Sequence, residues 1–224
     1  MTSDKKRMST EKKSMQYDNA LQIWDIQNGL LLEFGIDLVD RSFTLGSSVD
    51  DRSFHELDVK LGILERNLDE NGKAGPITIK LNNGGGDVYT AWAMVSRIKN
   101  SPCEITIKAY GHIMSAATMI FAAADVRQTS RYCTFMFHDV SLGFEGTGKN
   151  LQNISSQLSK EQSMYCEFLA ENTKKNSLYW KKVLDSRRDV FFTASEAVEA
   201  GLADLIFDKQ SKTTKQSKQK KGAK

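Results

Sequence analysis

The sequence predicts an α/β protein whose strands form a largely parallel sheet. Short β-branched segments alternate along the chain with stretches that carry apolar residues at helical spacing. This alternation is typical of βαβ units, in which each helix connects two parallel strands. With 224 residues and 40% hydrophobic residues, the chain is long enough to bury the core of one domain.

The first half of the chain begins with apolar segments and continues with predicted helices and strands in alternation. We expect one or two strands over 29–45 and an amphipathic helix over 53–70 with Ser53 as its N-cap. A turn then leads to a short β-branched strand over 77–83. The segment 84–100 begins with three glycines and continues as a helix. Its shared apolar face comprises Val88, Trp92, Val95 and Ile98.

The pattern continues through the middle of the chain with a strand over 103–111, a helix over 115–125 and a strand over 132–139. A long helix is expected over about 149–173, followed by a shorter one over 177–185. The long helix places a set of apolar residues at helical spacing, namely Leu151, Ile154, Leu158, Tyr165 and Leu169.

The last block predicts a capped helix within residues 193–207. Thr193 is placed as the N-cap, Glu196 three residues later completes a capping box, and Gly201 ends the helix.

The charge distribution divides the chain into an acidic body with basic ends. Residues 17–208 hold 19 basic and 26 acidic side chains, whereas residues after Asp208 include seven lysines and no acid. We expect a flexible segment over 1–18, one domain over 19–208 and a disordered Lys-rich tail over 209–224. A basic tail alone does not predict nucleic-acid binding, because solvated charged ends are common.

Several classes of protein are excluded by composition. No apolar run of 18 residues is present, so no membrane span is predicted, and the N-terminus lacks the apolar core of a signal peptide. We therefore expect a soluble cytoplasmic protein. Three widely spaced cysteines without a CxxC pair predict reduced thiols and no zinc site. The glycine run 84–86 matches neither phosphate-binding pattern, so no nucleotide cofactor is expected.

Ser115 raises the question of function, because it is a lone hydroxyl among glycine, alanine and large apolar residues after a predicted strand. A small filler at the start of a packed helix is one interpretation, and a nucleophile at a strand-to-helix junction is the other. A serine nucleophile needs a nearby base, usually histidine. Of the three histidines, His55 lies near a helix start, His112 lies three residues before Ser115, and His138 ends an apolar strand.

An imidazole that acts as a base is normally oriented by a carboxylate. Asp185 and Asp189 are the candidates, and Asp139 would point away because it is adjacent to His138. Residue spacing alone leaves these alternatives open.

Four segments in order resemble the Clp protease proteolytic subunit, ClpP, and its relatives in bacteriophage head maturation. The resemblance covers roughly residues 30–207. It rests on the glycine turn in "IKLNNGGGDVYTAWAM", the serine motif in "YGHIMSAAT", the histidine motif in "FMFHDVSLGFEGTGKNLQ" and the C-terminal block "LDSRRDVFFTASEAVEAGLADLIF". Asn83 and Gly84 stand where the family usually has serine and proline, which predicts a less rigid turn.

The resemblance implies a catalytic triad of Ser115 as nucleophile, His138 as general base and Asp189 as the orienting carboxylate. It further implies an oxyanion hole formed by the backbone N–H groups of Gly86 and Ala116. No metal or cofactor is implied.

The same resemblance implies a ClpP/crotonase-like fold of repeated βαβ units with a protruding helix–strand handle. The helix 149–173 and the strand around 141–148 would form that handle and mediate contact between rings. The family's proteases assemble into homo-oligomeric rings, commonly heptamers stacked as a tetradecamer, and work with an ATP-dependent unfoldase on polypeptide substrates. Two alternatives remain: a non-catalytic ring subunit of a Clp-type assembly, and a crotonase-like acyl-CoA enzyme with the same oxyanion arrangement.

Overall fold

The computed structural model describes residues 21–207 except 47, 70, 142–147 and 187. The terminal segments 1–18 and 209–224, for which we predicted flexibility, and most of the predicted strand 141–148 lie outside the described residues. None of the described helices is both long and apolar enough to cross a membrane.

One sheet organises the chain, with β1 to β5 and β8 arranged in the order β1-β2-β3-β4-β5-β8. Strand β6 pairs with β4 in parallel and with β7 in antiparallel orientation, and only β1 and β7 run against their neighbours. The bounds of the strands are Ile36–Asp37 (β1), Ser42–Leu45 (β2), Ile77–Asn83 (β3), Ile105–Met114 (β4), Val126–Thr129 (β5), Thr134–Phe137 (β6), Val190–Thr193 (β7) and Leu205–Ile206 (β8). The prediction of an α/β protein with a largely parallel sheet is confirmed.

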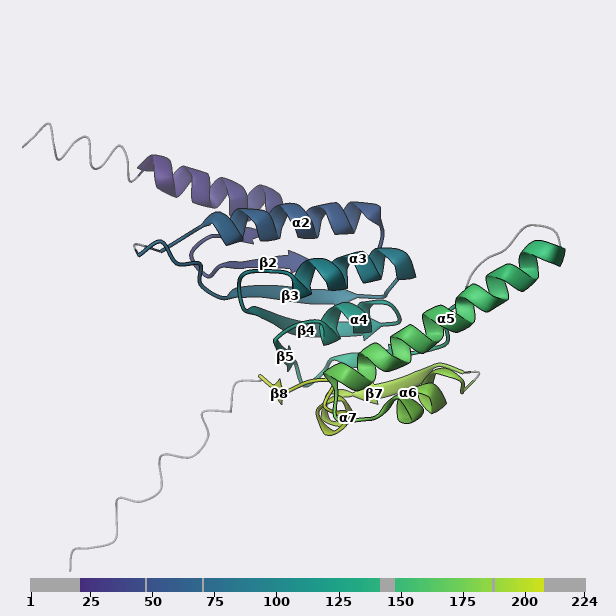
Figure 1. Ribbon diagram of the computed structural model, residues 1–224. Coiled ribbons are helices and arrows are strands. Elements are labelled where there is room, and N and C mark those ends of the chain that lie inside the picture. Colours follow the sequence, from purple (N-terminus) through teal and green to yellow (C-terminus); the bar gives the residue numbers. More distant parts are fainter. Residues whose placement is uncertain (1–20, 47, 70, 142–147, 187, 208–224) are drawn as a thin grey trace, which may run out of the picture.

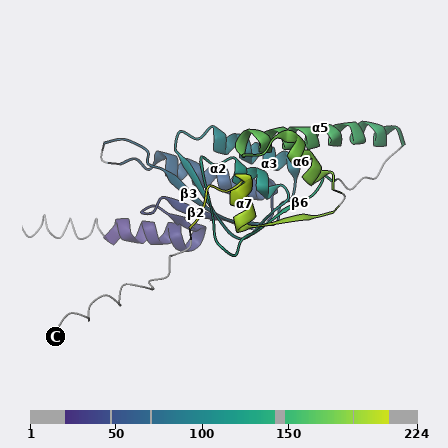
Figure 2. The same cartoon turned by 90° about the horizontal axis from the view of Figure 1, so that it is seen from below.

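Helices connect the parallel strands in succession and lie along the sheet (Figure 1). Because parallel crossovers are right-handed and β2 to β5 follow chain order, α2, α3 and α4 lie on the same face. The bounds of the helices are Asp51–Arg66 (α2), Val88–Lys99 (α3), Ala117–Ala122 (α4), Gly148–Asn172 (α5), Ser177–Leu184 (α6) and Ala194–Ala200 (α7). Helix α5 projects away from the body, as Figures 1 and 2 both show, which agrees with the helical part of the predicted handle.

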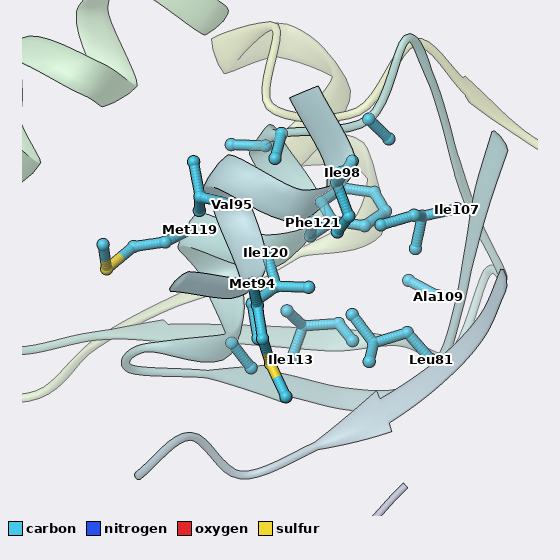
Figure 3. Packing of buried hydrophobic residues seen from close by; sticks show 14 of the residues in the cluster. Leu81, Met94, Val95, Ile98, Ile107, Ala109, Ile113, Met119, Ile120 and Phe121 are labelled. Atoms are coloured by element: carbon cyan, nitrogen blue, oxygen red, sulfur yellow. The ribbon is translucent and has the colours of Figure 1, made fainter. Parts of the chain in front are cut away.

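The core lies between this helical layer and the sheet. Inward-facing residues of β3 and β4 alternate with exposed or half-buried ones, as expected of strands with one covered face. Figure 3 shows Leu81 and Ile113 of the sheet close to Met94 of α3 and Ile120 of α4, and all four are fully buried. This packing fixes the ends of β3 and β4, from which the candidate site is built.

Three predicted boundaries are wrong, each for a local reason. Residues 21–34 form a helix, where we expected a strand over part of 29–45, because a short apolar run does not distinguish the two structures. This helix ends at Gly35, which takes a left-handed φ of 65°. The N-cap of helix α2 is Asp50, and Ser53, which we predicted as the N-cap, occupies the N3 position of the capping box.

The third error concerns the nucleophile candidate. Helix α4 begins at Ala117, with Ala116 as its N-cap, so Ser115 precedes the helix instead of starting it. No strand was predicted over the residues of β5. The residues of β7, which follow Asp189, were not predicted to form a strand either.

Other local predictions are confirmed. Thr193 and Glu196 form the expected capping box of α7, and Gly201 ends that helix in a left-handed conformation. The three cysteines are free and buried. Burial raises the pKa of the Cys133 thiol to about 11, which keeps it protonated at neutral pH.

Candidate functional site

The site begins where β4 changes its neighbour. Residues 106–109 of β4 pair with β5, whereas residues 112–114 pair with β6. The register between β3 and β4 shifts between these two stretches, at Gly111, which has a left-handed φ of 59°. A Cβ atom at this position would lie 2.8 Å from the Asn82 side-chain oxygen. The bulge therefore brings the carboxyl end of β4 between β3 and β6.

Ser115 follows this strand in a strained conformation. It is one of two described non-glycine residues with positive φ, at 53°. For an L-amino acid this conformation costs about 1–2 kcal/mol, and such strain gathers at functional sites. The Ser115 N–H donates a hydrogen bond to the Met136 carbonyl at 2.8 Å, which ties the turn to β6 two residues before His138.

His138 lies next to the nucleophile candidate. It follows the last residue of β6, and its Nε2 lies 2.7 Å from Ser115 Oγ. Both side chains are half-buried. This is the hydrogen-bonded contact that proton transfer from the hydroxyl to the imidazole requires. The structure thus brings together two residues that are 23 positions apart in the sequence.

The glycine turn after β3 lies against the other side of Ser115. A Cβ atom on Gly85 would lie 2.6 Å from the Met114 carbonyl and 2.8 Å from Ser115 Cβ. A Cβ atom on Gly86 would lie 2.3 Å from the Val49 carbonyl. Both glycines have positive φ, at 92° and 152°. Only glycine permits this backbone conformation together with such close approach.

Two backbone N–H groups at this turn are available to a ligand. Val49 accepts a hydrogen bond from the Asp87 N–H at 2.8 Å and donates one to the Gly85 carbonyl at 2.9 Å. The Gly86 N–H between them donates to no other described residue, and the same holds for the Ala116 N–H. Free amides beside a nucleophile can stabilise an oxyanion that develops during acyl transfer.

A cavity of about 380 Å³ opens over these groups. Ser115, His138, Ala116 and Gly86 all contribute to its lining, together with Tyr165 of α5. The nucleophile, the base and both free amides therefore face a common space large enough for a substrate segment.

Asp189 is brought near His138 by strand pairing. In the antiparallel pair of β6 and β7, Phe137 is the register partner of Val190, so His138 and Asp189 each stand one position beyond the last pair of the ladder. Residues directly opposite each other have Cβ atoms roughly 5 Å apart and point to the same face. The Asp189 side chain is exposed, and in the described part of the chain no hydrogen bond joins it to His138. The third member of the predicted triad thus lies at the same end of this strand pair as His138, without a described hydrogen bond to it.

The other carboxylates considered for this role occupy different positions. Asp185 accepts a hydrogen bond from the Gln162 side chain at 2.8 Å, so one of its oxygens is already engaged on α5. Asp139 is exposed and lines the cavity. No described hydrogen bond joins either residue to His138.

His112 does not take part in the contact with Ser115. It lies on β4 with its Nε2 toward Gly84, since a Cβ atom built there would be 3.7 Å away. The structure thus separates the two histidines near Ser115 and brings only His138 within hydrogen-bond distance of the hydroxyl.

Three residues that support the site were not identified from the sequence. Asn83 is buried and accepts a hydrogen bond from the Gly85 N–H at 2.8 Å, which holds the glycine turn. Asparagine before glycines is a recognisable turn signal, so this contact could have been foreseen. Thr118 and Tyr165 contact the Ser115 carbonyl. Tyr165 was assigned only to the apolar face of the long helix, and no local signal marks it as different.

An α/β sheet that presents a Ser–His pair and two free amides at one strand end has the features of a serine hydrolase. Comparison with known proteins identifies the family. The Clp protease family model matches residues 34–210, and the chain therefore belongs to the Clp protease family.

Individual relatives agree with this assignment. The chain is 29% identical over 173 residues to the ATP-dependent Clp protease proteolytic subunit 2 of Corynebacterium efficiens, covering 75% of this chain and 83% of that protein. It is 25% identical over 177 residues to the ATP-dependent Clp protease proteolytic subunit of Porphyromonas gingivalis, covering 78% and 77% of the two chains.

The fold comparison gives the same result. A solved structure of a ClpP1 mutant from Listeria monocytogenes matches with a TM-score of 0.68 and 19% identity, covering 81% of this chain and 97% of that one. The predicted ClpP-type fold is confirmed.

The contacts of the glycine turn generate a paired prediction. Gly85→Ala should abolish hydrolysis at the site, because the added methyl group would collide with Met114 and Ser115. Gly84→Ala is the matched control, since its Cβ atom would meet only His112 at an ordinary 3.7 Å. Peptide hydrolysis and thermal unfolding of both variants would be measured. If both variants hydrolysed the peptide at the native rate, the turn would not be what holds the nucleophile.

Proposed function

We propose that this protein is a serine endopeptidase that cleaves unfolded or extended polypeptides through an acyl-enzyme at Ser115. The observation that carries this proposal is the 2.7 Å contact between Ser115 Oγ and His138 Nε2 beside two free amides. Membership of the Clp protease family, whose relatives are named proteolytic subunits, supports the same conclusion.

The proposed reaction uses the groups in the order that their positions allow. His138 Nε2 takes the proton of Ser115 as Oγ attacks the substrate carbonyl. The N–H groups of Gly86 and Ala116 donate to the oxyanion, and loss of one such donor typically costs about 3 kcal/mol of transition-state stabilisation. The imidazolium then protonates the leaving amine, and water attacks the acyl-enzyme with His138 again as base.

We propose Asp189 as the group that orients His138, on the basis of the register between β6 and β7. Catalytic hydrogen bonds are often long or poorly aligned before substrate binds. Rotation of the exposed Asp189 side chain would direct a carboxylate oxygen toward Nδ1, because both residues stand one position beyond the last pair of the ladder. Asp185 would first have to release Gln162.

We further propose that the chain assembles into a homo-oligomeric ring of the Clp type in the cytoplasm, with an ATP-dependent unfoldase as partner. The helix over 21–34 supports assembly, since it exposes a series of large apolar residues: Leu21, Ile23, Trp24, Ile26, Leu31, Leu32 and Phe34. Such an apolar surface is unusual for a monomer and typical of an interface. The projecting helix α5 would extend toward a second ring (Figure 1).

Covalent labelling tests the nucleophile directly. A fluorophosphonate probe should modify one residue per chain, Ser115, and Ser115→Ala should remove both labelling and peptide hydrolysis. His138→Ala should slow both by at least about a hundredfold, because the hydroxyl loses its base. His112→Ala is the control and should label at the native rate. Unchanged labelling in His138→Ala would contradict the proposed base.

The same experiment distinguishes the two alternatives. A non-catalytic ring subunit would not react with the probe, and a crotonase-like enzyme would not need the Ser–His pair for turnover.

The orienting carboxylate can be identified by a matched pair of amide variants. Asp189→Asn should lower kcat by roughly a hundredfold or more, because Nδ1 of His138 loses the partner that fixes its tautomer. Asp185→Asn should retain activity close to native. The reverse result, with Asp185→Asn inactive and Asp189→Asn active, would assign the role to Asp185.

Assembly is tested by the mass of the full-length chain in solution. Light scattering should give a multiple of the 25.1 kDa chain that corresponds to a closed ring. Replacing Trp24 and Leu32 with Glu should dissociate it, because both side chains are exposed on the helix over 21–34. A native protein that stays monomeric at all concentrations would contradict ring assembly.

A further inference from the structure

The carbonyl of Ser115 is held by a chain of hydroxyl groups that begins on α5. The Thr118 Oγ1 donates to the Ser115 carbonyl at 2.7 Å, and the Thr118 N–H donates to the same oxygen at 2.9 Å. Tyr165 Oη hydrogen-bonds Thr118 Oγ1 and also lies 3.3 Å from the Ser115 carbonyl. The N–H and the hydroxyl of Thr118 thus both donate to one backbone oxygen in the strained turn, and the Tyr165 hydroxyl lies against both oxygens.

The direction of these bonds follows from the number of protons. Each hydroxyl has a single proton, and the Thr118 hydroxyl donates its proton to the Ser115 carbonyl, which can only accept. Tyr165 must therefore be the donor in its bond with Thr118. The result is a directed chain from the phenol to the threonine hydroxyl to the nucleophile's carbonyl, in which each bond polarises the next.

The hydroxyl groups of this hydrogen-bonded series are shielded from water. Thr118 is fully buried, and Tyr165 is 3% exposed. Burial raises the pKa of the Tyr165 phenol, so that it remains a donor across the physiological pH range. The bond to the Ser115 carbonyl helps to hold a conformation that a non-glycine residue otherwise avoids, since φ at Ser115 is 53°.

We infer that Tyr165 is a positioning residue that acts through Thr118, so that helix α5 holds the Ser115 turn in its reactive conformation. This inference rests on the proposed peptidase function. Tyr165 belongs to the long projecting helix, whereas Thr118 belongs to α4, so the hydroxyl chain links the handle to the nucleophile. A shift of α5 relative to α4 would release the carbonyl and allow the turn to relax.

The removal of one oxygen atom tests this role. Tyr165→Phe should lower kcat for a short fluorogenic peptide by about tenfold to a hundredfold with KM unchanged, because a displaced nucleophile reacts more slowly but leaves the cavity intact. The rate constant of fluorophosphonate labelling should fall by the same factor, while the final stoichiometry stays at one label per chain. Tyr132→Phe, at an 86% exposed position, is the control and should match the native protein.

Variants of Thr118 extend the test to the hydroxyl group between Tyr165 and the Ser115 carbonyl. Thr118→Val should reproduce the loss caused by Tyr165→Phe, and Thr118→Ser should rescue activity because it restores the hydroxyl. The double variant Tyr165→Phe/Thr118→Val should be no slower than the slower single variant, as expected for groups that act as one unit. If Tyr165→Phe does not fold, the Thr118 pair still decides the question.

Other results would overturn the inference. A purely structural role would reduce the fraction of chains labelled but leave the labelling rate of the folded fraction at the native value. A rise in KM alone would show that Tyr165 contacts the substrate in the cavity. Loss of labelling in native protein, by contrast, would contradict the proposed peptidase function itself.

Discussion

The site depends on the left-handed turn at Ser115, held between β3 and β6. On one side, the glycines after β3 come so close that a methyl group on Gly85 would overlap the serine. On the other side, the Ser115 N–H is bonded to β6 at Met136, two residues before His138. The conformation is unfavourable for serine by itself, so it persists because the packed sheet and the surrounding hydrogen bonds fix it.

This constraint explains why the chemistry lies where it does. The bulge at Gly111 lets β4 leave β5 and pair with β6 over its last residues, which brings the end of β6 alongside the nucleophile. Pairing of β6 with β7 then brings Asp189 and His138 to the same end of the two strands, each one position beyond the last pair. The positions of all three proposed catalytic side chains are thus consequences of strand register, and no flexible loop is needed to bring the serine and the histidine together.

Much of this arrangement could be predicted from the sequence, because its signals are local. Alternating burial in β3 and β4, the helical face of α3 and the capping box at Thr193 are all encoded within a few residues. The wrong predictions also have local causes. The apolar run before Gly35 is compatible with helix and strand alike, and the pattern at Ser115 does not reveal that the residue precedes its helix.

The contacts that complete the site could not be predicted, since they join distant segments. Tyr165 fits the apolar spacing of α5 and shows no local sign that its hydroxyl reaches Thr118, 47 residues earlier. The register of β6 against β7, which brings His138 and Asp189 to the same end of the two strands, is a tertiary property as well. Resemblance to a family indicated the three candidate residues. The structure shows a contact between two of them, Ser115 and His138, and places Asp189 at the same end of the β6–β7 pair as His138.

We propose that Ser115 Oγ and the N–H groups of Gly86 and Ala116 form one reaction centre. The most direct measurement is a crystal structure of the protein after reaction with a phosphonylating probe. We expect phosphorus bonded to Ser115 Oγ and its free oxygen within about 3 Å of both amide nitrogens. An adduct oxygen directed away from both amides, or modification of another residue, would contradict it.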